Sequence, residues 1–184
     1  MTYNATYGSV NLIYLGNFAS TDPYEHNSSS EDTSFLEGVQ VDHTQMQIVQ
    51  ASYKDANSNG VIDDNDYGTY DKLNYDLGNG SVSNETDGTL AANVTLKLAD
   101  GSTTTVDVVM MQQDNGDLFI SDLQNNGTLD NLQISGVTIN HITGTDYSGW
   151  YSDQSVDGSA IVAPDPQADG IVEGSNAGET IDLA

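Results

Sequence analysis

Residues 55–66 form a twelve-residue run in which oxygen-bearing side chains occupy positions 1, 3, 5, 9 and 12, around Gly60 at position 6. The side chains are those of Asp55, Asn57, Asn59, Asp63 and Asp66. Carboxylate and amide oxygens at this spacing can wrap a Ca²⁺ ion, while a residue without Cβ takes the sharp turn. Val61 at position 7 would add its backbone carbonyl oxygen. The run therefore predicts a calcium site made by these six residues.

A polar turn is the alternative interpretation, because Asn, Asp, Ser and Gly are also the residues that turns use. A turn needs only about two to five such residues. Here the register continues over the whole run, with the apolar Ile62 at position 8 as an anchor. This favours calcium. Asp66 stands where an EF-hand has a bidentate Glu, so we expect a weaker site with one fewer oxygen.

A second run, Asp122 to Gln133, repeats the arrangement of acid, amide, Asn-Gly and apolar residue, but it has Gln133 at position 12 in place of a carboxylate. Two interpretations remain open. It is either a second calcium loop or, as the default, a hairpin turn built on Asn126-Gly127.

Charge is the main deviation from an ordinary composition. The 184 residues include 28 acidic residues and three lysines, for a formal net charge of −25. Nucleic acid and anionic membranes bind through Lys and Arg, so we expect no nucleic-acid partner and no membrane insertion. There is no cysteine, so a bound cation would take the stabilising role of disulfides. A lone, imperfect calcium loop suits extracellular calcium, where dissociation constants of roughly 10⁻⁴–10⁻³ M suffice.

The sequence contains no recognisable catalytic set, and we expect no enzyme. No cysteine, G-x-S-x-G turn or H-E-x-x-H helix is present, and His26, His43 and His141 are scattered. One aromatic cluster, Tyr147–Tyr151 with Trp150, could stack on a sugar. The alternative, a Trp that closes the end of the core, is favoured.

Strands must position the predicted loop, because alternating apolar runs dominate and none has a sustained helical period. The expected strands are Val10–Leu15, Gly38–Tyr53, Leu73–Leu77, Asn93–Leu98, Thr104–Met111, Leu118–Ile120 and Leu132–Ile139. Asp100-Gly101 predicts a hairpin in which Val94, Leu96 and Leu98 face the same core as Val106, Val108 and Met110. Asn79-Gly80, Asp87-Gly88 and Asn115-Gly116 predict further turns. The fold class is all-β, an antiparallel sandwich or barrel with an inserted calcium loop and an extended C-terminal tail.

We expect a β-rich core domain over residues 1–162 and a linker with a tail over residues 163–184. Pro164 and Pro166 interrupt the strand-like pattern at this boundary. The tail, Asp169–Ala184, resembles one degenerate RTX nonapeptide repeat, with Glu179 where that family has Asp. A single repeat cannot stack into a β-roll, so this segment is expected to be flexible on its own or to pair with another chain.

Two resemblances to known families rest on short motifs. The run from Asp55 to Asp66 is similar to the single loop of dockerins, without a second repeat of comparable quality, so cohesin binding is not implied. The motifs Asn11–Phe18, Asn59–Asp63 and Thr128–Leu132, with the tail, resemble the N-terminal regions of secreted marine alphaproteobacterial proteins that carry an RTX-like connector and a self-processing Hint domain. The Hint catalytic residues have no counterpart here, so autoprocessing is not implied.

Together these features predict an extracellular calcium-binding structural or adhesive subunit that assembles with itself into a homo-oligomer or filament, or with a matrix. A carbohydrate-binding module or polysaccharide-active protein is the alternative, and a virion fibre or decoration protein is a further one. The N-terminus has neither a basic nor an apolar signal region. We therefore expect a secreted or cell-surface protein without an N-terminal signal peptide.

Overall fold

The protein is built almost entirely of β-strands, as expected. A computed structural model describes residues 5–24, 29–64, 71–145, 150–151 and 154–166. The strands are β1 (Thr6–Asn17), β2 (Gln40–Asp42), β3 (Gln47–Asp55), β4 (Val61–Ile62), β5 (Lys72–Asp76), β6 (Ser81–Leu98), β7 (Thr103–Gln113), β8 (Asp117–Asp122), β9 (Gln133–Gly144), β10 (Trp150–Tyr151) and β11 (Ala160–Ile161). One 3₁₀ turn, η1 (Ser34–Leu36), interrupts them. None of the helices in the described ranges has the length and apolar character that crossing a membrane requires.

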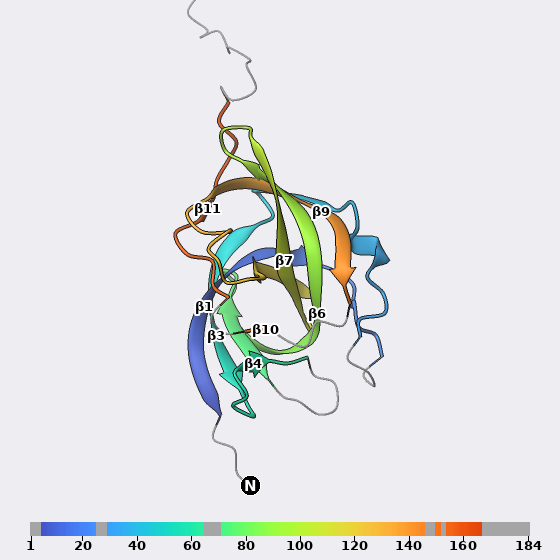
Figure 1. Ribbon diagram of the computed structural model, residues 1–184. Helices are drawn as coiled ribbons and strands as arrows, with labels where there is room; N and C mark the ends of the chain where they lie inside the picture. The colour runs from blue at the N-terminus through green and yellow to red at the C-terminus, as the bar shows by residue number, and fades with distance from the viewer. Residues whose placement is uncertain (1–4, 25–28, 65–70, 146–149, 152–153, 167–184) are drawn as a thin grey trace, which may run out of the picture.

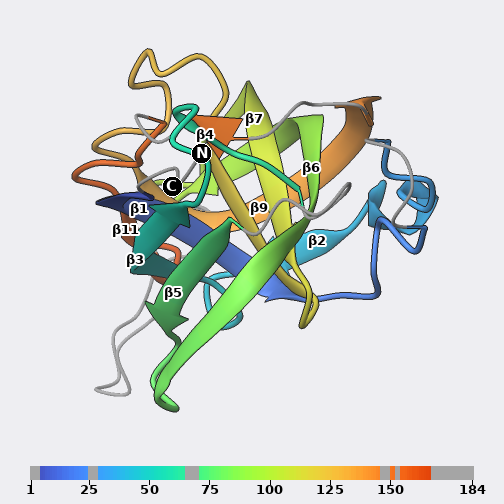
Figure 2. The same ribbon diagram turned by 90° about the horizontal axis from the view of Figure 1, so that it is seen from below.

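The main sheet closes on itself through the long strand β6. Its first residues pair with β5, and from Thr86 onward it pairs with β7. Because β5, β3, β1, β8 and β7 follow one another by pairing, the two ends of this path meet at β6. Figures 1 and 2 show β1, β3 and β5 side by side, with β6 running on from β5 to β7. The second half of β6 also pairs with β9, so the sheet branches there.

Strands β1, β7 and β8 separate two apolar clusters, because their side chains alternate between the two faces. Core 1 contains Ile13, Leu15, Leu36, Val41, Met46, Leu90, Ala92, Val94, Leu96, Val106, Val108, Met110, Leu118, Ile120, Leu129, Ile134, Val137, Ile139 and Val156. Core 2 contains Val10, Leu12, Val49, Ala51, Ile62, Leu73, Tyr75, Val109, Met111, Phe119 and Trp150. Where both faces of these three strands are buried, their sequences are therefore almost continuous runs of apolar residues.

The β6–β7 hairpin has the predicted register. Val94 pairs with Val106 and Leu96 with Thr104. As predicted, Val94, Leu96, Val106, Val108 and Met110 belong to core 1, and Leu98 packs against it. Gly101 has a φ of +81°, which its missing Cβ allows, and the Gly101 N–H donates to the Leu98 carbonyl.

Two sequence-based expectations about the strands are wrong. The run Gly38–Tyr53 is not one strand, because β2 pairs with β9 whereas β3 pairs with β1. Asp87-Gly88 does not end a strand. It lies inside β6, where the register shifts between Thr86 and Gly88 and produces a β-bulge.

Short elements complete the fold. β4 and β10 form a separate two-stranded antiparallel sheet, and β11 pairs in parallel with the start of β9. The chain reaches the β6–β7 turn at Asp165, whose N–H donates to the Ala99 carbonyl. The predicted tail, Asp169–Ala184, lies outside the described residues.

The hairpin register predicts opposite outcomes for two neighbouring substitutions. Leu96→Asp should destabilise the protein by about 3–5 kcal/mol, because an unpaired charge would enter core 1. Lys97→Asp should change the free energy of unfolding by no more than about 1 kcal/mol, because Lys97 is exposed. Urea unfolding measures both; equal effects would show that the register is displaced by one residue.

Candidate metal centre

The predicted calcium loop leaves the end of β3 and returns to the protein through β4. Asp55 is the last residue of β3 and its side chain is only 2% exposed. Ser58 and Gly60 have φ values of +57° and +86°. This left-handed conformation lets the chain turn back sharply, and it is the reason for a glycine at position 6. Figure 1 places β3 and β4 at the lower end of the molecule.

Hydrogen bonds draw the loop side chains inward. Asp55 Oδ2 accepts from the Gly60 N–H at 2.8 Å, and Asn59 Oδ1 accepts from the Val61 N–H at 2.8 Å. Asn57 Oδ1 accepts from the Asn59 N–H at 2.9 Å. The Asn57 and Asn59 amides in turn donate to Asp63 Oδ2, at 3.3 and 2.9 Å. Four of the predicted ligand side chains therefore share one small hydrogen-bond network.

Of the other two predicted ligands, Val61 and Asp66, the structure describes only Val61. Val61 lies in β4 and pairs with Tyr151, so its backbone is fixed by the small sheet. Asp66 lies outside the described residues, and its role stays a prediction.

The loop is anchored in core 2 by its apolar residue. Ile62 is fully buried and pairs with Trp150 across the β4–β10 sheet. Trp150 is also fully buried, and its Nε1–H donates to Ser121 Oγ at 2.8 Å. The ring of Tyr53 packs edge-on against it with a centroid separation of 5.9 Å. Trp150 thus closes the core, the favoured interpretation, and offers no face for stacking on a sugar.

Asp71 is a residue of this site that the sequence interpretation missed. Its Oδ1 accepts from the Ala56 N–H at 2.7 Å and its Oδ2 from the Asp63 N–H at 2.9 Å, so it braces both limbs of the loop. Burial raises the pKa of Asp71, as do the charges of Asp63 and Asp55, although the two backbone hydrogen bonds lower it. Only the β3–β5 pairing, with Lys54 opposite Lys72, brings Asp71 beside the loop.

The second run has a similar backbone conformation. Asn125 and Gly127, at positions 4 and 6, have φ values of +47° and +74°. The buried Asp122 accepts from the Gln124 and Thr128 N–H groups at 3.0 and 2.9 Å. Leu129 is fully buried in core 1, as Ile62 is in core 2.

The default interpretation of this run as a hairpin turn is wrong. β8 pairs with β1 and β7, whereas β9 pairs with β2, β6 and β11. The run therefore connects strands that do not pair with each other. Gln133 at position 12 is the first residue of β9 and pairs with Ala160.

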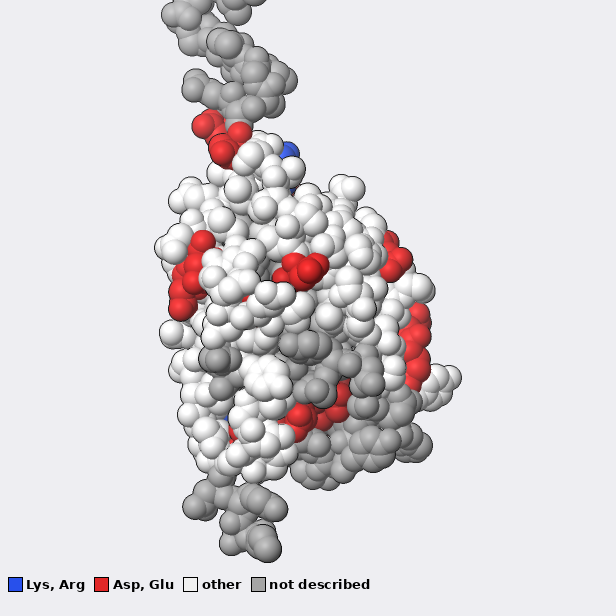
Figure 3. Space-filling view, in the orientation of Figure 1, with Lys and Arg blue, Asp and Glu red and all other residues white. Residues whose placement is uncertain are grey.

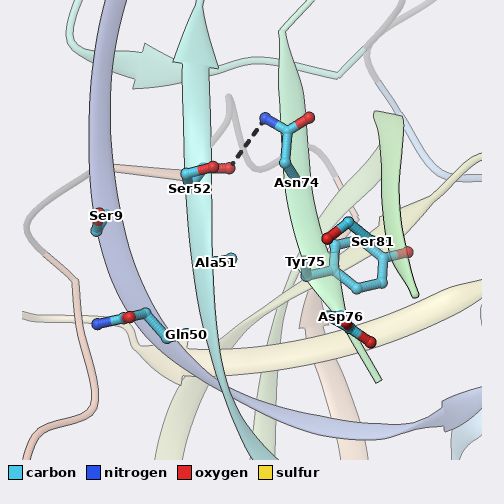
Figure 4. Close-up of a pocket in the computed structure, with 8 residues that line it drawn as sticks. All are labelled: Ser9, Gln50, Ala51, Ser52, Asn74, Tyr75, Asp76 and Ser81. Atoms are coloured by element: carbon cyan, nitrogen blue, oxygen red, sulfur yellow. Dashed lines mark hydrogen bonds between the residues drawn. The ribbon is translucent and has the colours of Figure 1, made fainter. Parts of the chain in front are cut away.

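A polar pocket of about 280 Å³ opens on another part of the barrel. The pairing of β3 with β5 ends at Ser52 and Asn74, and beyond this point the two strands separate. The pocket lies in the gap, lined by Ser9, Gln50, Ala51, Ser52, Asn74, Tyr75, Asp76 and Ser81 (Figure 4). Asn74 Nδ2 donates to the Ser52 carbonyl at 3.4 Å. The pocket is rich in hydrogen-bonding groups.

The two described histidines lie at different places on the surface. His43 lines a surface pocket with Lys97, His141 is exposed on β9, and His26 lies outside the described residues. Across the described ranges, no three or more His, Cys, Asp or Glu side chains form a group that could hold a metal. The candidate loop offers two described carboxylates, two amides and a backbone carbonyl, and Asp66 is the predicted third carboxylate.

Acidic side chains are spread over the surface. Figure 3 shows separate acidic groups on the visible face and very few basic atoms. Lys72 is paired with Glu85 at 2.9 Å, on the β5–β6 hairpin. The surface therefore favours cations over anions as partners.

Comparison with known proteins places the chain in no established group, since no family model, curated protein or solved structure matches it. The similarity to secreted Hint-domain and RTX-like proteins remains a prediction from short motifs.

The raised pKa of Asp71 predicts a pH dependence in calcium-free buffer. Its folded-state pKa lies above the ordinary 3.8, so ionisation removes stability as the pH rises from that value through the folded-state pKa. Asp71→Asn carries no charge. The free energy of unfolding of this variant should therefore increase relative to that of the wild type as the pH rises from about 4 to about 7.

Asp100→Asn is the control, because the hydrogen bonds from Ser102 lower the pKa of Asp100. The Asp100→Asn variant should lose stability relative to the wild type as the pH rises toward about 4, and its profile should run nearly parallel to that of the wild type from about 4 to about 7. Parallel pH profiles of urea unfolding for Asp71→Asn and the wild type would contradict the assignment.

Proposed function

We propose that this protein is an extracellular calcium-binding structural or adhesive subunit. The observation that carries the proposal is that Asp55, Asn57, Asn59 and Asp63 lie together in one loop. Ile62 anchors this loop, because it is buried against Trp150. Oxygen ligands of this kind suit Ca²⁺. With the Val61 carbonyl and Asp66 they make up the proposed shell.

Calcium would act on both the loop and the whole molecule. Asp55 and Asp63 carry like charges that a divalent cation offsets, and the ion would hold β3 and β4 in their positions around core 2. The net charge of −25 also opposes the compact state, so bound cations reduce the repulsion across the surface.

Calcium should therefore raise the melting temperature of the protein. Ligand binding to the folded state alone contributes about 2.7 kcal/mol when free Ca²⁺ exceeds the dissociation constant a hundredfold. EGTA should remove this increment, and NaCl should restore only the part that arises from screening. Differential scanning calorimetry with CaCl₂, EGTA and NaCl separates the two contributions.

The double variant Asp55→Ala, Asp66→Ala should lose the calcium-specific increment. Asp100→Asn is a matched control, because it also removes acidic charge but lies in the exposed β6–β7 turn. If the double variant keeps the full calcium-dependent increase in melting temperature, the assignment of the site is wrong.

Self-assembly is the second part of the proposal. Among the described residues, β3 pairs with β1 along Gln47–Asp55, but with β5 only at Ser52–Lys54. The side of β3 facing the polar pocket thus has a stretch to which a strand from another copy could add by backbone hydrogen bonds. A head-to-tail contact of this kind propagates as a filament unless its rotation closes a ring.

The proposed linking strand is either Met1–Tyr7 or Asp169–Ala184. In the part of these segments that the structure describes, Thr6 pairs with Asp55 and Tyr7 is exposed. The full chain should form oligomers in millimolar calcium. The two segments are deleted in separate variants, and the variant that lacks the linking strand should be a monomer. Multi-angle light scattering measures the mass, and a full-length chain that stays monomeric rules out assembly.

Carbohydrate binding is the second candidate, and the polar pocket favours it. Its amide, hydroxyl and carboxylate groups could hydrogen-bond a sugar, although Tyr75 is buried and its hydroxyl donates to Asp117 at 2.7 Å. Glycan binding that Asn74→Ala abolishes would support this function. A virion fibre or decoration protein would share the calcium and assembly behaviour of the first proposal.

A further inference from the structure

The β-bulge in β6 directs an acidic side chain toward a distant segment of the chain. Thr86 pairs with Gln113 and Gly88 with Gln112, so Asp87 is the extra residue between them. A bulge of this kind bends the strand and changes the direction of a side chain, which is why bulges often lie at functional sites. Asp87 is 7% exposed.

The segment that Asp87 meets is residues 20–22, which follow β1. Ser20 Oγ donates to Asp87 Oδ2 at 3.1 Å and accepts from the Asp22 N–H at 3.1 Å. The Thr21 N–H donates to Gln112 Oε1 at 2.7 Å. Ser20 therefore joins the backbone of Asp22 to the carboxylate of Asp87. Asp22 itself is 2% exposed.

Thr21 provides an independent observation that points to a ligand. Its side chain is fully buried, and within the described part of the chain Thr21 Oγ1 has no hydrogen-bond partner. Native proteins leave few buried hydroxyls in this state, and each one calls for a missing partner such as an ion.

Gly88 shows where this hydroxyl points. A Cβ on Gly88 would lie 3.2 Å from Thr21 Oγ1, 2.9 Å from Ser30 Oγ and 3.4 Å from Asp22 Cβ. The Gly88 φ angle is not in the left-handed region, so the glycine is required by close approach rather than by backbone conformation. Oxygen-bearing side chains from two separate segments, residues 20–22 and Ser30, thus converge on the bulge.

We propose a second cation site at the β6 bulge, in which Asp22, Asp87 and Thr21 Oγ1 bind Ca²⁺. All three offer hard oxygen atoms, which Ca²⁺ prefers, and two carboxylates match its charge. The site joins the segment after β1 to β6, and it shares no residue with the loop at Asp55. It therefore deepens the proposed calcium function without depending on the same ligands.

The test follows backbone amide resonances of the full chain by NMR during titration with CaCl₂. The Gly60 amide reports the loop, and the Gly88 amide reports the bulge. Both should shift in the wild type, with their own dissociation constants. A Gly60 amide that does not respond contradicts the proposed loop site only, whereas a silent Gly88 amide overturns the bulge site only.

Thr21→Val is the sharpest variant, because it removes the hydroxyl while keeping the size of the side chain. It should weaken calcium binding reported by Gly88 about tenfold and leave the Gly60 response unchanged. Thr21→Ser keeps a hydroxyl and should retain binding. If Thr21→Val binds calcium at Gly88 as the wild type does, Thr21 is not a ligand and the site is wrong.

Asp87→Asn removes a carboxylate ligand, so it should abolish the response of the Gly88 amide to calcium and preserve that of the Gly60 amide. The dispersion of the amide spectrum verifies that each variant is folded. Should Asp87→Asn fail to fold, the Thr21 pair still decides between a cation ligand and a hydroxyl that serves packing alone.

Discussion

The pairing of β6 with three strands is the constraint on which the rest of the structure depends. Its first residues pair with β5, its later residues with β7, and its second half also with β9. One continuous strand thereby closes the sheet and supports its branch. A strand that curves round to close a sheet changes direction along its length, and the partners of β6 change between Glu85 and Thr86. The bulge at Asp87 supplies this change, because an inserted residue bends the strand and increases its twist. The same bulge aims Asp87 at the segment that follows β1.

Several acidic side chains among the described residues accept hydrogen bonds from backbone N–H groups in turns. Asp55, Asp76, Asp100 and Asp122 each accept from backbone groups that the strands leave unpaired. A deeper example is Asp117, which accepts from the hydroxyls of Tyr75 and Tyr14 at 2.7 and 3.2 Å. Burial, with the charge and hydrogen bond of Asp117, raises the pKa of Tyr14 to about 12, so this tyrosine stays a donor at neutral pH. Carboxylates used in this way cost less to bury, but their summed charge still favours cations.

The candidate calcium loop shows how far a local motif can predict a site. The spacing of Asp55, Asn57, Asn59 and Asp63 was sufficient to bring these side chains together, because the loop turns on its own left-handed residues. Asp71 could not be found in this way. It precedes an ordinary alternating strand, and only the β3–β5 register brings it to the loop. Thr21 and Asp87 could not be connected in this way either, since they stand 66 positions apart in the sequence. No local spacing connects them.

The sequence by itself determined the local structure of this protein. Period-2 alternation specified strands, and Asp100-Gly101 specified a hairpin with the correct register and core face. These features depend on neighbours within a few residues. Tertiary structure alone decided which strands pair, so Gly38–Tyr53 divided between two partners and Asn126-Gly127 joined strands that never meet. It also decided that Asp87-Gly88 bends a strand instead of ending it, whereas the closure of core 2 by Trp150 was already the favoured interpretation of the sequence. The physical reason is that strand partners and buried faces are selected by the apolar area that distant segments remove from water together, which no short stretch of sequence records.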